Sequence, residues 1–347
     1  PFEITKQMVW DAFKRVKANK GTGGIDGQSI QEFEADLKNN LYKIWNRMAS
    51  GSYFPPAVKA VPIPKKNGGV RILGIPTVSD RIAQMVVKQA IEPKIDPIFH
   101  PDSQGYRPGK SALQAVGKVR ERCWRYNWVL EFDIKGLFDN IDHTLLMKAV
   151  THHVKEKWAI LYIERWLKAP MRTQDGSDIP RECGTPQGGV ISPLLANLFL
   201  HYAFDRWMRQ HYPAVPIVRY ADDGVAHCRT KEKALQLMEA LKTRFQEVGL
   251  EIQPEKTRII YCKDDERRGG DEETTSFDFL GYTFRPRRSK NRNGKFFINF
   301  TPGVSQKACK AMKETTRSWK LRMRSDKTLQ DLAKMYNPVV QGWINYY

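Results

Sequence analysis

The sequence contains no run of about 18 apolar residues, the length with which a helix crosses a bilayer. Internal repeats, low-complexity tracts and a secretory signal are also absent. Cysteine is scarce, with five among 347 residues, widely spaced and odd in number: Cys123, Cys183, Cys228, Cys262 and Cys309. Such cysteines do not build the disulfide framework of a secreted domain, so we expect reduced thiols and a cytoplasmic location. The missing apolar run predicts that no segment crosses a membrane.

Histidine is also infrequent, with seven residues and one adjacent pair, His152-His153. No set of cysteines and histidines has the spacing of a zinc finger or a zinc nuclease. We therefore expect no zinc ligation, and we expect the histidine pair on a solvated helix face.

Acidic residues are outnumbered, since 57 Lys and Arg stand against 38 Asp and Glu, giving a net charge of +19. Residues 285–347 hold 15 basic and three acidic residues, so most of the excess lies at the end of the sequence. A basic excess predicts binding to phosphates, although many kinds of RNA-binding protein share it. Aromatic residues are interleaved there, and their apolar spacing favours packing between helices over stacking on bases.

The segment Tyr220-Ala221-Asp222-Asp223 follows the apolar run Val215 to Val218. Two adjacent carboxylates disfavour each other's ionised form unless a cation neutralises them, which indicates a Mg²⁺ site and nucleotidyl transfer. An alternative interpretation makes Asp223-Gly224 a simple hairpin turn. The segment alone leaves both interpretations open.

A third carboxylate, Asp133, ends the predicted strand 128–133 and precedes a break in the pattern. A capping or turn aspartate is the alternative for this position. Three carboxylates from a strand end and a hairpin could hold two divalent ions roughly 3.5–4 Å apart, one for a primer 3′-hydroxyl and one for the departing pyrophosphate. Such chemistry also needs cations that touch the triphosphate.

Two segments offer contacts for a triphosphate. Residues 61–72 predict two short strands joined by a basic loop, with Lys65 and Arg71 at its ends; a phosphate clamp and a solvated basic hairpin are both consistent with it. Residues 184–193 place glycines beside Gln187, before a predicted helix with Ser192 as N-cap and Pro193 at its first position. We expect this loop to approach a nucleotide closely.

Several ordered blocks resemble the reverse transcriptases of bacterial group II introns, the intron-encoded maturases. The blocks are Gly23-Gly24-Ile25-Asp26-Gly27, Ile72-Leu73-Gly74-Ile75-Pro76-Thr77 with Asp80-Arg81, Gln104-Gly105-Tyr106-Arg107-Pro108-Gly109, Phe132-Asp133-Ile134, residues 184–197, Tyr220 to Asp223, and Phe279-Leu280-Gly281. The resemblance extends over nearly the whole sequence. Longer relatives continue into a DNA-binding and endonuclease part that this sequence is expected to lack.

The resemblance implies an α+β fold of the right-hand polymerase type, with fingers, palm and the start of a helical thumb. It implies Asp133, Asp222 and Asp223 as catalytic metal ligands, joined by the carbonyl of Ile134, with two Mg²⁺ ions that Mn²⁺ could replace. The implied segments are an N-terminal extension at 1–50, fingers and palm at 51–300, and the start of the thumb, or maturase domain X, at 301–347.

The resemblance also implies the contacts of the substrates. Lys65, Arg71, Gln187 and Gly188 would lie at the deoxynucleotide, and Phe138 would exclude a ribonucleotide 2′-hydroxyl unless it is an ordinary core aromatic. Lys256 would protonate pyrophosphate, although a lysine after a Pro-Glu turn is commonly a solvated surface group. The hairpin Phe279-Leu280-Gly281 would grip the primer.

The implied function is an RNA-directed DNA polymerase that extends a primer on an RNA template and takes part in intron splicing and retrohoming. The implied partners are an RNA template, a DNA or RNA primer, dNTPs, a group II intron RNA and target DNA, without a membrane. Alternatives are an RNA-binding splicing cofactor with little polymerase activity and a domesticated reverse transcriptase in repair or phage defence. An RNA-making polymerase of viral type is disfavoured by Phe138.

Periodicity predicts the following elements. Helices are expected near 5–18, 29–49, 80–92, 110–126, 142–168, 193–210 and 231–248, and strands near 58–63, 70–73, 128–133, 215–220, 224–228, 258–262 and 296–300. The charged stretch 264–275 is expected to be a solvent loop.

Overall fold

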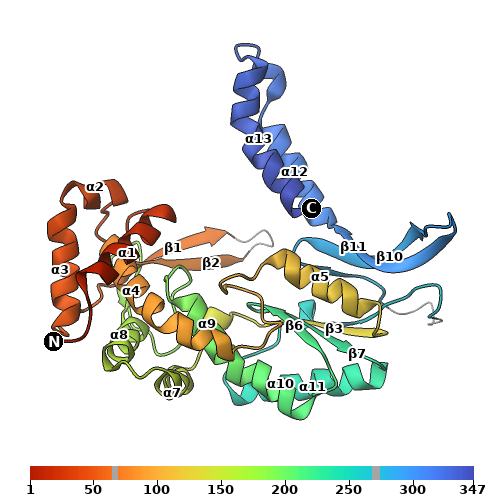
Figure 1. Cartoon of the computed structure of the whole chain (residues 1–347), viewed down its shortest axis with the longest axis horizontal. Helices are drawn as coiled ribbons and strands as arrows, with labels where there is room; N and C mark the ends of the chain where they lie inside the picture. Colours follow the sequence, from red (N-terminus) through yellow and green to blue (C-terminus); the bar gives the residue numbers. More distant parts are fainter. Residues whose placement is uncertain (65–68, 268–273) are drawn as a thin grey trace. The chain divides into compact units, whose positions relative to one another are not determined.

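The computed structural model describes residues 1–64, 69–267 and 274–347, and the fold is mixed α and β (Figure 1). Lys65 and half of the expected loop 264–275, residues 268–273, therefore lie outside the described residues. The chain forms two compact units. The first consists of Pro1–Pro108, Ile134–Pro213 and Leu241–Ile252, and the second of Gly109–Asp133, Ala214–Ala240 and Gln253–Tyr347.

The first unit is mainly helical. Its elements are α1 (Lys6–Ala18), α2 (Ile30–Ala35), α3 (Leu37–Ala49), α4 (Val78–Ile95), η1 (Asp96–Ile98), α6 (Leu137–Asn140), α7 (His143–His153), α8 (Lys157–Lys168), α9 (Ser192–Leu200), η2 (His201–Asp205) and α10 (Arg206–His211). Helix α1 packs against α3 and α4. A capping box starts α2, because the Ser29 and Glu32 side chains each accept a hydrogen bond from the other residue's backbone N–H.

Two predicted helices are each divided in two. The helix expected at 29–49 breaks at Asp36, whose ψ of 48° is not helical. The helix expected at 142–168 breaks at Val154, which is extended and ends α7. Because the Val154 side chain is buried like the helical positions around it, the apolar pattern continues through the break and hides it.

A buried polar network holds the start of α4. The Thr77 hydroxyl caps the helix by accepting from the Asp80 N–H, and the Asp80 carboxylate accepts hydrogen bonds from Tyr53, Trp166 and Gln84 at 2.7–2.9 Å. Burial raises the pKa of Asp80 to about 6, against these hydrogen bonds, which lower it. The Asp80-Arg81 block is thus placed in the core of this unit.

A small sheet in the first unit has the strand order β2-β1-β4-β5. Strands β1 (Val58–Pro64) and β2 (Val70–Ile75) pair antiparallel as expected, with Ile63 opposite Arg71. The short strands β4 (Met171–Arg172) and β5 (Asp178–Ile179), which were not predicted, extend the sheet from β1.

The start of α9 differs from the prediction. Ser192 is the first helical residue and not the N-cap, and Pro193 follows it. The Ser192 side chain is buried and shares a 2.8 Å hydrogen bond with the Thr185 hydroxyl, so it fixes the preceding loop instead of capping the helix. The predicted helix 193–210 then contains one π-helical stretch, η2, between α9 and α10.

The second unit contains two sheets. The first has the order β6-β7-β3-β8, from β6 (Ile217–Tyr220), β7 (Asp223–Cys228), β3 (Trp128–Asp133) and β8 (Arg258–Tyr261). The second has the order β11-β10-β9, from β9 (Phe277–Phe279), β10 (Tyr282–Lys290) and β11 (Phe296–Val304). Helix α5 (Ala112–Cys123) packs its buried face on a core shared by both sheets, including Val129, Val225 and Phe284.

The remaining helices are α11 (Lys231–Glu247), which both units share, the short helices η3 (Pro254–Lys256) and η4 (Leu321–Met323), and the hairpin of α12 (Gln306–Ser318) and α13 (Leu329–Tyr346). In the hairpin, the Trp319 ring stacks on Tyr336 and on Trp343 at centroid distances of 4.4 and 5.8 Å. These aromatic residues hold the two helices together, in line with the packing role expected from their spacing.

Candidate active site

The predicted carboxylates meet at one edge of the β6-β7-β3-β8 sheet. Asp133, the last residue of β3, lies directly opposite Asp223, the first residue of β7. Asp222 and Ala221 form the two-residue turn between β6 and β7. Ala221 has a φ of +57°, a conformation that is unfavourable for a residue with a Cβ and that marks local strain beside this site.

The turn alternative for Asp223-Gly224 is wrong, because both residues lie inside β7. Gly224 is opposite Phe132, and a Cβ added at Gly224 would lie 2.1 Å from Phe132 Cζ. The glycine therefore makes room for an aromatic ring and does not form a bend. Asp133 likewise belongs to the strand ladder and caps no helix.

The carboxylates repel one another. Burial, together with the nearby charges of Asp222 and Asp133, raises the pKa of Asp223 to about 7, while the charge of Lys256 lowers it. The Lys256 ammonium donates a 2.9 Å hydrogen bond to Asp133 Oδ2. Burial lowers the pKa of Lys256, but the contact with Asp133 outweighs it and raises the pKa overall. Lys256 lies in η3 and acts as the counter-ion of this site.

The donor set suits a divalent cation. No group of three His, Cys, Asp or Glu side chains among the described residues is already arranged around a metal position. The donors at the sheet edge are nevertheless carboxylate oxygens, which Mg²⁺ prefers, and their crowding favours any cation that would neutralise them.

Glu131 adds a further carboxylate to this face of the sheet. It lies two residues before Asp133 on β3, so both side chains project from the same face. Burial raises the pKa of Glu131 to about 7, although Arg258 pairs with it at 2.8 Å and lowers it. Sequence reasoning missed Glu131, and the two-residue strand period was the signal that could have found it.

The hairpin expected to grip a primer is a tight turn between β9 and β10. Leu280 and Gly281 have φ of +49° and +81°, the pattern of the turns that join antiparallel strands with a right-handed twist. The Leu280 carbonyl accepts a 2.8 Å hydrogen bond from the Tyr346 hydroxyl, and a Cβ on Gly281 would lie 2.7 Å from the Tyr347 hydroxyl. Phe279 is buried, and the Tyr346 hydrogen bond links the hairpin to the end of α13.

The first unit brings together most of the predicted nucleotide contacts. Arg71 Nε donates to the Gln187 side-chain oxygen, and the Gln187 amide donates to both oxygens of Asp139 at 3.0 and 2.9 Å. The Gly74 N–H also donates to the Gln187 carbonyl at 3.1 Å. Strand β2, the loop that carries Gln187 and Gly188, and the short helix α6 are thus linked through side chains, and Asp139 is a residue that sequence reasoning missed.

Phe138 lies in α6 and is half-buried, so it is not a fully enclosed core residue. Its ring meets that of Tyr106 edge-on at a centroid distance of 6.3 Å. Tyr106 has a φ of +59° and is 49% exposed, which identifies it as a second aromatic residue at this place that the sequence analysis did not single out. Ile134, the predicted carbonyl ligand, is buried and forms a bridge with Ile252.

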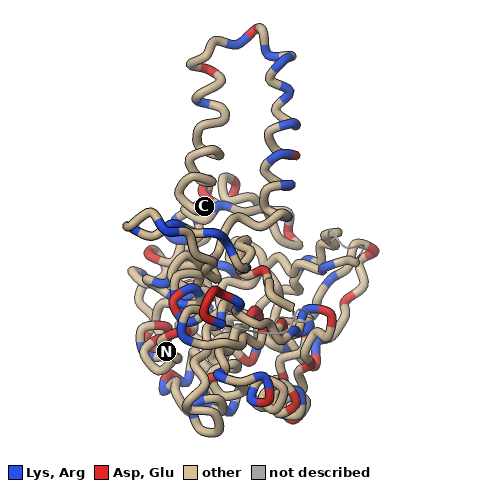
Figure 2. The backbone as a smooth tube through the Cα atoms, turned by 90° about the vertical axis from the view of Figure 1, so that its right-hand side faces the viewer, with Lys and Arg blue, Asp and Glu red and all other residues tan. Residues whose placement is uncertain are grey.

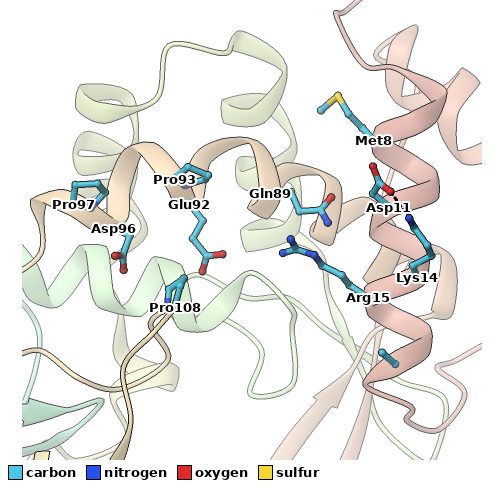
Figure 3. A pocket seen from close by; sticks show the side chains of 11 residues that line it. Met8, Asp11, Lys14, Arg15, Gln89, Glu92, Pro93, Asp96, Pro97 and Pro108 are labelled. Carbon is cyan, nitrogen blue, oxygen red and sulfur yellow. Dashed lines mark ion pairs between the residues drawn. The ribbon is translucent and has the colours of Figure 1, made fainter. Parts of the chain in front are cut away.

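A hollow of about 930 Å³ lies between α1 and α4 (Figure 3). Its carboxylates have partners, because Asp11 pairs with Lys14 at 2.7 Å, Glu92 with Lys88 at 3.5 Å, and Asp96 with Arg107 at 2.7 Å. With its charges compensated internally and none of the predicted site residues in its lining, this hollow shows no catalytic constellation.

Basic residues follow α12 and the connection to α13, where Lys and Arg recur with few acidic residues between them (Figure 2). Among the helices that the structure describes, none has the length and apolarity needed to span a membrane. The described α12–α13 hairpin thus offers a basic surface consistent with a polyanionic partner.

Comparison with known families gives two matches. Residues 63–284 match the family described as "Reverse transcriptase (RNA-dependent DNA polymerase)". Residues 309–347 match the "Group II intron, maturase-specific domain".

Two curated proteins are similar over most of this chain. "Protein YkfC" of Escherichia coli (strain K12) is 30% identical over 93% of this chain and 92% of its own length. "Group II intron-encoded protein LtrA" of Lactococcus lactis subsp. cremoris is 29% identical over 84% of this chain, which spans 57% of LtrA.

Solved structures resemble the fold. A telomerase from Candida albicans aligns with a TM-score of 0.52 at 12% identity, covering 74% of this chain and 49% of the telomerase chain. A telomerase from Candida tropicalis aligns with a TM-score of 0.51 at 15% identity, covering 66% of this chain and 53% of that one. The expected α+β polymerase fold is confirmed by these likenesses.

Proposed function

The chain belongs to the reverse transcriptases of the group II intron protein family, and we propose from this premise that it extends a primer 3′-hydroxyl with dNTPs on an RNA template at Asp133, Asp222 and Asp223. The observation that carries the proposal is the pairing of Asp133 with Asp223 across the β3–β7 ladder, next to the Asp222 turn. Three carboxylates at a strand edge can hold the two divalent ions that stabilise the attacking and leaving oxygens in such a transfer.

Divalent metal use follows from the family, and the proposed ligands of two Mg²⁺ ions, or of Mn²⁺ in their place, are the three aspartates and the Ile134 carbonyl. Bound ions would supply the positive charge that activates the primer hydroxyl and stabilises the departing pyrophosphate. Lys256, which holds Asp133 at 2.9 Å, is proposed to give a proton to pyrophosphate.

The nucleotide contacts proposed for the first unit are Arg71, Gln187 and Gly188, with Lys65 beside them in the part outside the described residues. Phe138 is proposed to exclude ribonucleotides, and the exposed ring of Tyr106 would support it. The hairpin Phe279-Leu280-Gly281 is proposed to hold the primer end, since Tyr346 and Tyr347 fix its backbone.

The family membership implies a nucleic-acid template and an intron RNA as partners. We propose that the chain binds this RNA as a ribonucleoprotein that supports splicing and retrohoming into target DNA. The proposed segments remain an extension at 1–50, fingers and palm at 51–300, and a thumb from 301. The basic surface of α12 also suits the second candidate, a splicing cofactor with little polymerase activity.

Primer extension tests the proposal. The chain, its Asp222→Asn variant and its Asp175→Asn variant are compared on a DNA primer annealed to an RNA template, with and without Mg²⁺, at equal occupancy of the RNA. Asp175 lies in the exposed β4–β5 turn and serves as the matched control. Extension that depends on Mg²⁺ and is lost only in Asp222→Asn is expected, while extension by Asp222→Asn at the control rate would refute the assignment.

A further inference from the structure

A second hollow in the first unit, of about 630 Å³, is separate from every residue assigned to polymerisation. It is formed by α7, α9, η2, α10 and the last turns of α11, and the side chains that matter here are Lys148, Tyr202, Arg206, Trp207 and Arg244. We call it the α7–α10 pocket. Its volume lies within the range of about 300–1,000 Å³ that is usual for pockets that hold small molecules.

The π-helical stretch η2 forms one wall of the α7–α10 pocket. A π-helical turn removes backbone carbonyls from the regular α-helical pattern, and such turns are frequent at functional sites. Here the Arg244 guanidinium donates to the carbonyls of Ala203 at 3.0 Å and Tyr202 at 3.2 Å. Its third contact is with Glu247 at 3.0 Å. Arg244 thus holds the wall in place, and its charge is balanced by Glu247.

The charge of the α7–α10 pocket is of one sign. No aspartate or glutamate is among the described residues that line it, whereas the hollow between α1 and α4 contains several. Lys148 of α7 and Arg206 of α10 are both exposed, and neither forms an ion pair with any carboxylate of the described chain. Cations that meet in a concave site without a carboxylate partner favour an anionic ligand.

Aromatic side chains provide the second feature of the α7–α10 pocket. Trp207 is half-exposed, and its ring lies 5.3 Å from the rings of both His211 and Tyr212. Tyr202 is also half-exposed, and the Arg206 guanidinium lies over its ring at 5.7 Å. Flat rings beside cations suit a ligand with its own flat ring, and bases stack on such side chains regardless of sequence.

We propose that the α7–α10 pocket binds a nucleotide, with the base against Trp207 or Tyr202 and the phosphate at Lys148 and Arg206. A lone inorganic anion would use the cations but not the rings, and an acidic peptide would leave the rings uncovered. The nucleotide can be free in solution or can be an unpaired nucleotide of an RNA strand, since both present the same base and phosphate.

Photolabelling of the full chain with 8-azido-AMP, followed by peptide mapping, tests this site separately from the polymerase site. Labelling is expected within residues 143–153 and 199–211. Arg206→Glu and Trp207→Ala are expected to reduce that labelling about tenfold, because each removes a contact of the order of a charge-assisted hydrogen bond or a base stack. The matched control is Arg209→Glu, which makes the same charge change at an exposed position of α10 outside the pocket.

Competition identifies the source of the nucleotide. Protection by an unstructured hexaribonucleotide at concentrations where AMP does not protect would support an RNA nucleotide, and protection by AMP alone would support a free one.

Equal labelling of Arg206→Glu and Arg209→Glu would overturn the proposal, as would protection by polyglutamate equal to that by RNA. Circular dichroism melting of each variant, with Trp207→Phe as a conservative substitution expected to retain labelling, separates lost binding from lost folding.

Discussion

The Lys256 ammonium lies 2.9 Å from Asp133 Oδ2, and this pair joins η3 to the end of β3 within the second unit. Lys256 was singled out in the sequence only through a family resemblance, with a solvated surface position as the alternative. The structure gives it a defined carboxylate partner at the candidate site, although the side chain remains 60% exposed. From this place Lys256 can hold the Asp133 carboxylate in position, and it can donate a proton to a leaving group.

Lys256→Ala is expected to lower the single-turnover rate of primer extension by about 10²–10⁴-fold, the range of a lost proton donor, with little change in primer–template affinity. Lys256→Arg retains the charge near Asp133, so its single-turnover rate should lie between the rates of the parent and of Lys256→Ala. Lys168→Ala, on an exposed helix face, is the control. Rates of Lys256→Ala within twofold of the parent would exclude both roles.

Phe138→Ala is expected to increase ribonucleotide incorporation, because it removes the half-buried ring proposed to meet a 2′-hydroxyl. The measurement is the ratio of kcat/KM for a dNTP to that for the matching rNTP, and a fall of about tenfold or more corresponds to losing roughly 1.4 kcal/mol of discrimination. Tyr106→Ala, at the neighbouring ring, should produce a smaller change. An unchanged ratio in Phe138→Ala would remove the gate assignment.

Gly224→Ala is expected to destabilise the chain by about 1–3 kcal/mol, because its Cβ would collide with the Phe132 ring. Urea unfolding should show the loss, and adding Phe132→Leu should recover part of it, since the two positions share one space. Gly117→Ala in α5, where a Cβ meets nothing within 4 Å, is the control and should stabilise by up to about 1 kcal/mol. Additive effects at positions 132 and 224 would argue against the collision.

Asp80 is expected to make stability fall as pH rises. Its pKa is about 6 in the folded chain against 3.8 as the ordinary value, so the folded state holds the proton more tightly. The stabilisation is complete below pH 3.8 and is lost through pH 6, which amounts to about 2 kcal/mol between pH 4.5 and 7. Urea unfolding of the parent and of Asp80→Asn across this range should give curves that converge at low pH. Parallel curves would contradict the assignment.

The candidate site was largely predictable because its signals are local. Asp222 and Asp223 follow a predicted strand and Asp133 ends another, the family resemblance assigned them to one site, and the structure shows that the two strands pair. Local sequence patterns do not show how much room the side chains of one strand leave for the residues of the neighbouring strand. Whether Asp223-Gly224 forms a turn or lies inside a strand depends on the opposite strand, where Phe132 occupies the space beside Gly224.

Helix ends and side-chain partners were less predictable for the same reason. Ser192 satisfies every local rule for an N-cap, yet its hydroxyl bonds to Thr185 in a preceding loop. Val154 continues an apolar period while its backbone leaves the helix. Asp139 lies in none of the blocks that carry the resemblance, and Tyr106 lies in one without an assigned role, because the two residues matter only through Gln187 and Phe138.

The hydrogen bonds from Arg71 to Gln187 and from Gln187 to Asp139 place strand β2 and helix α6 in one reciprocal linkage. Under the nucleotide contacts proposed above, a triphosphate at Arg71 would compete with the Gln187 oxygen, and the released amide would change how strongly it restrains Asp139, one residue after Phe138. If phosphate binding at Arg71 shifts the position of α6 and so changes the fit of the sugar against Phe138, the fit of the sugar must change phosphate affinity by the same free energy. A poorly fitting sugar would therefore weaken phosphate binding at Arg71 without touching that arginine.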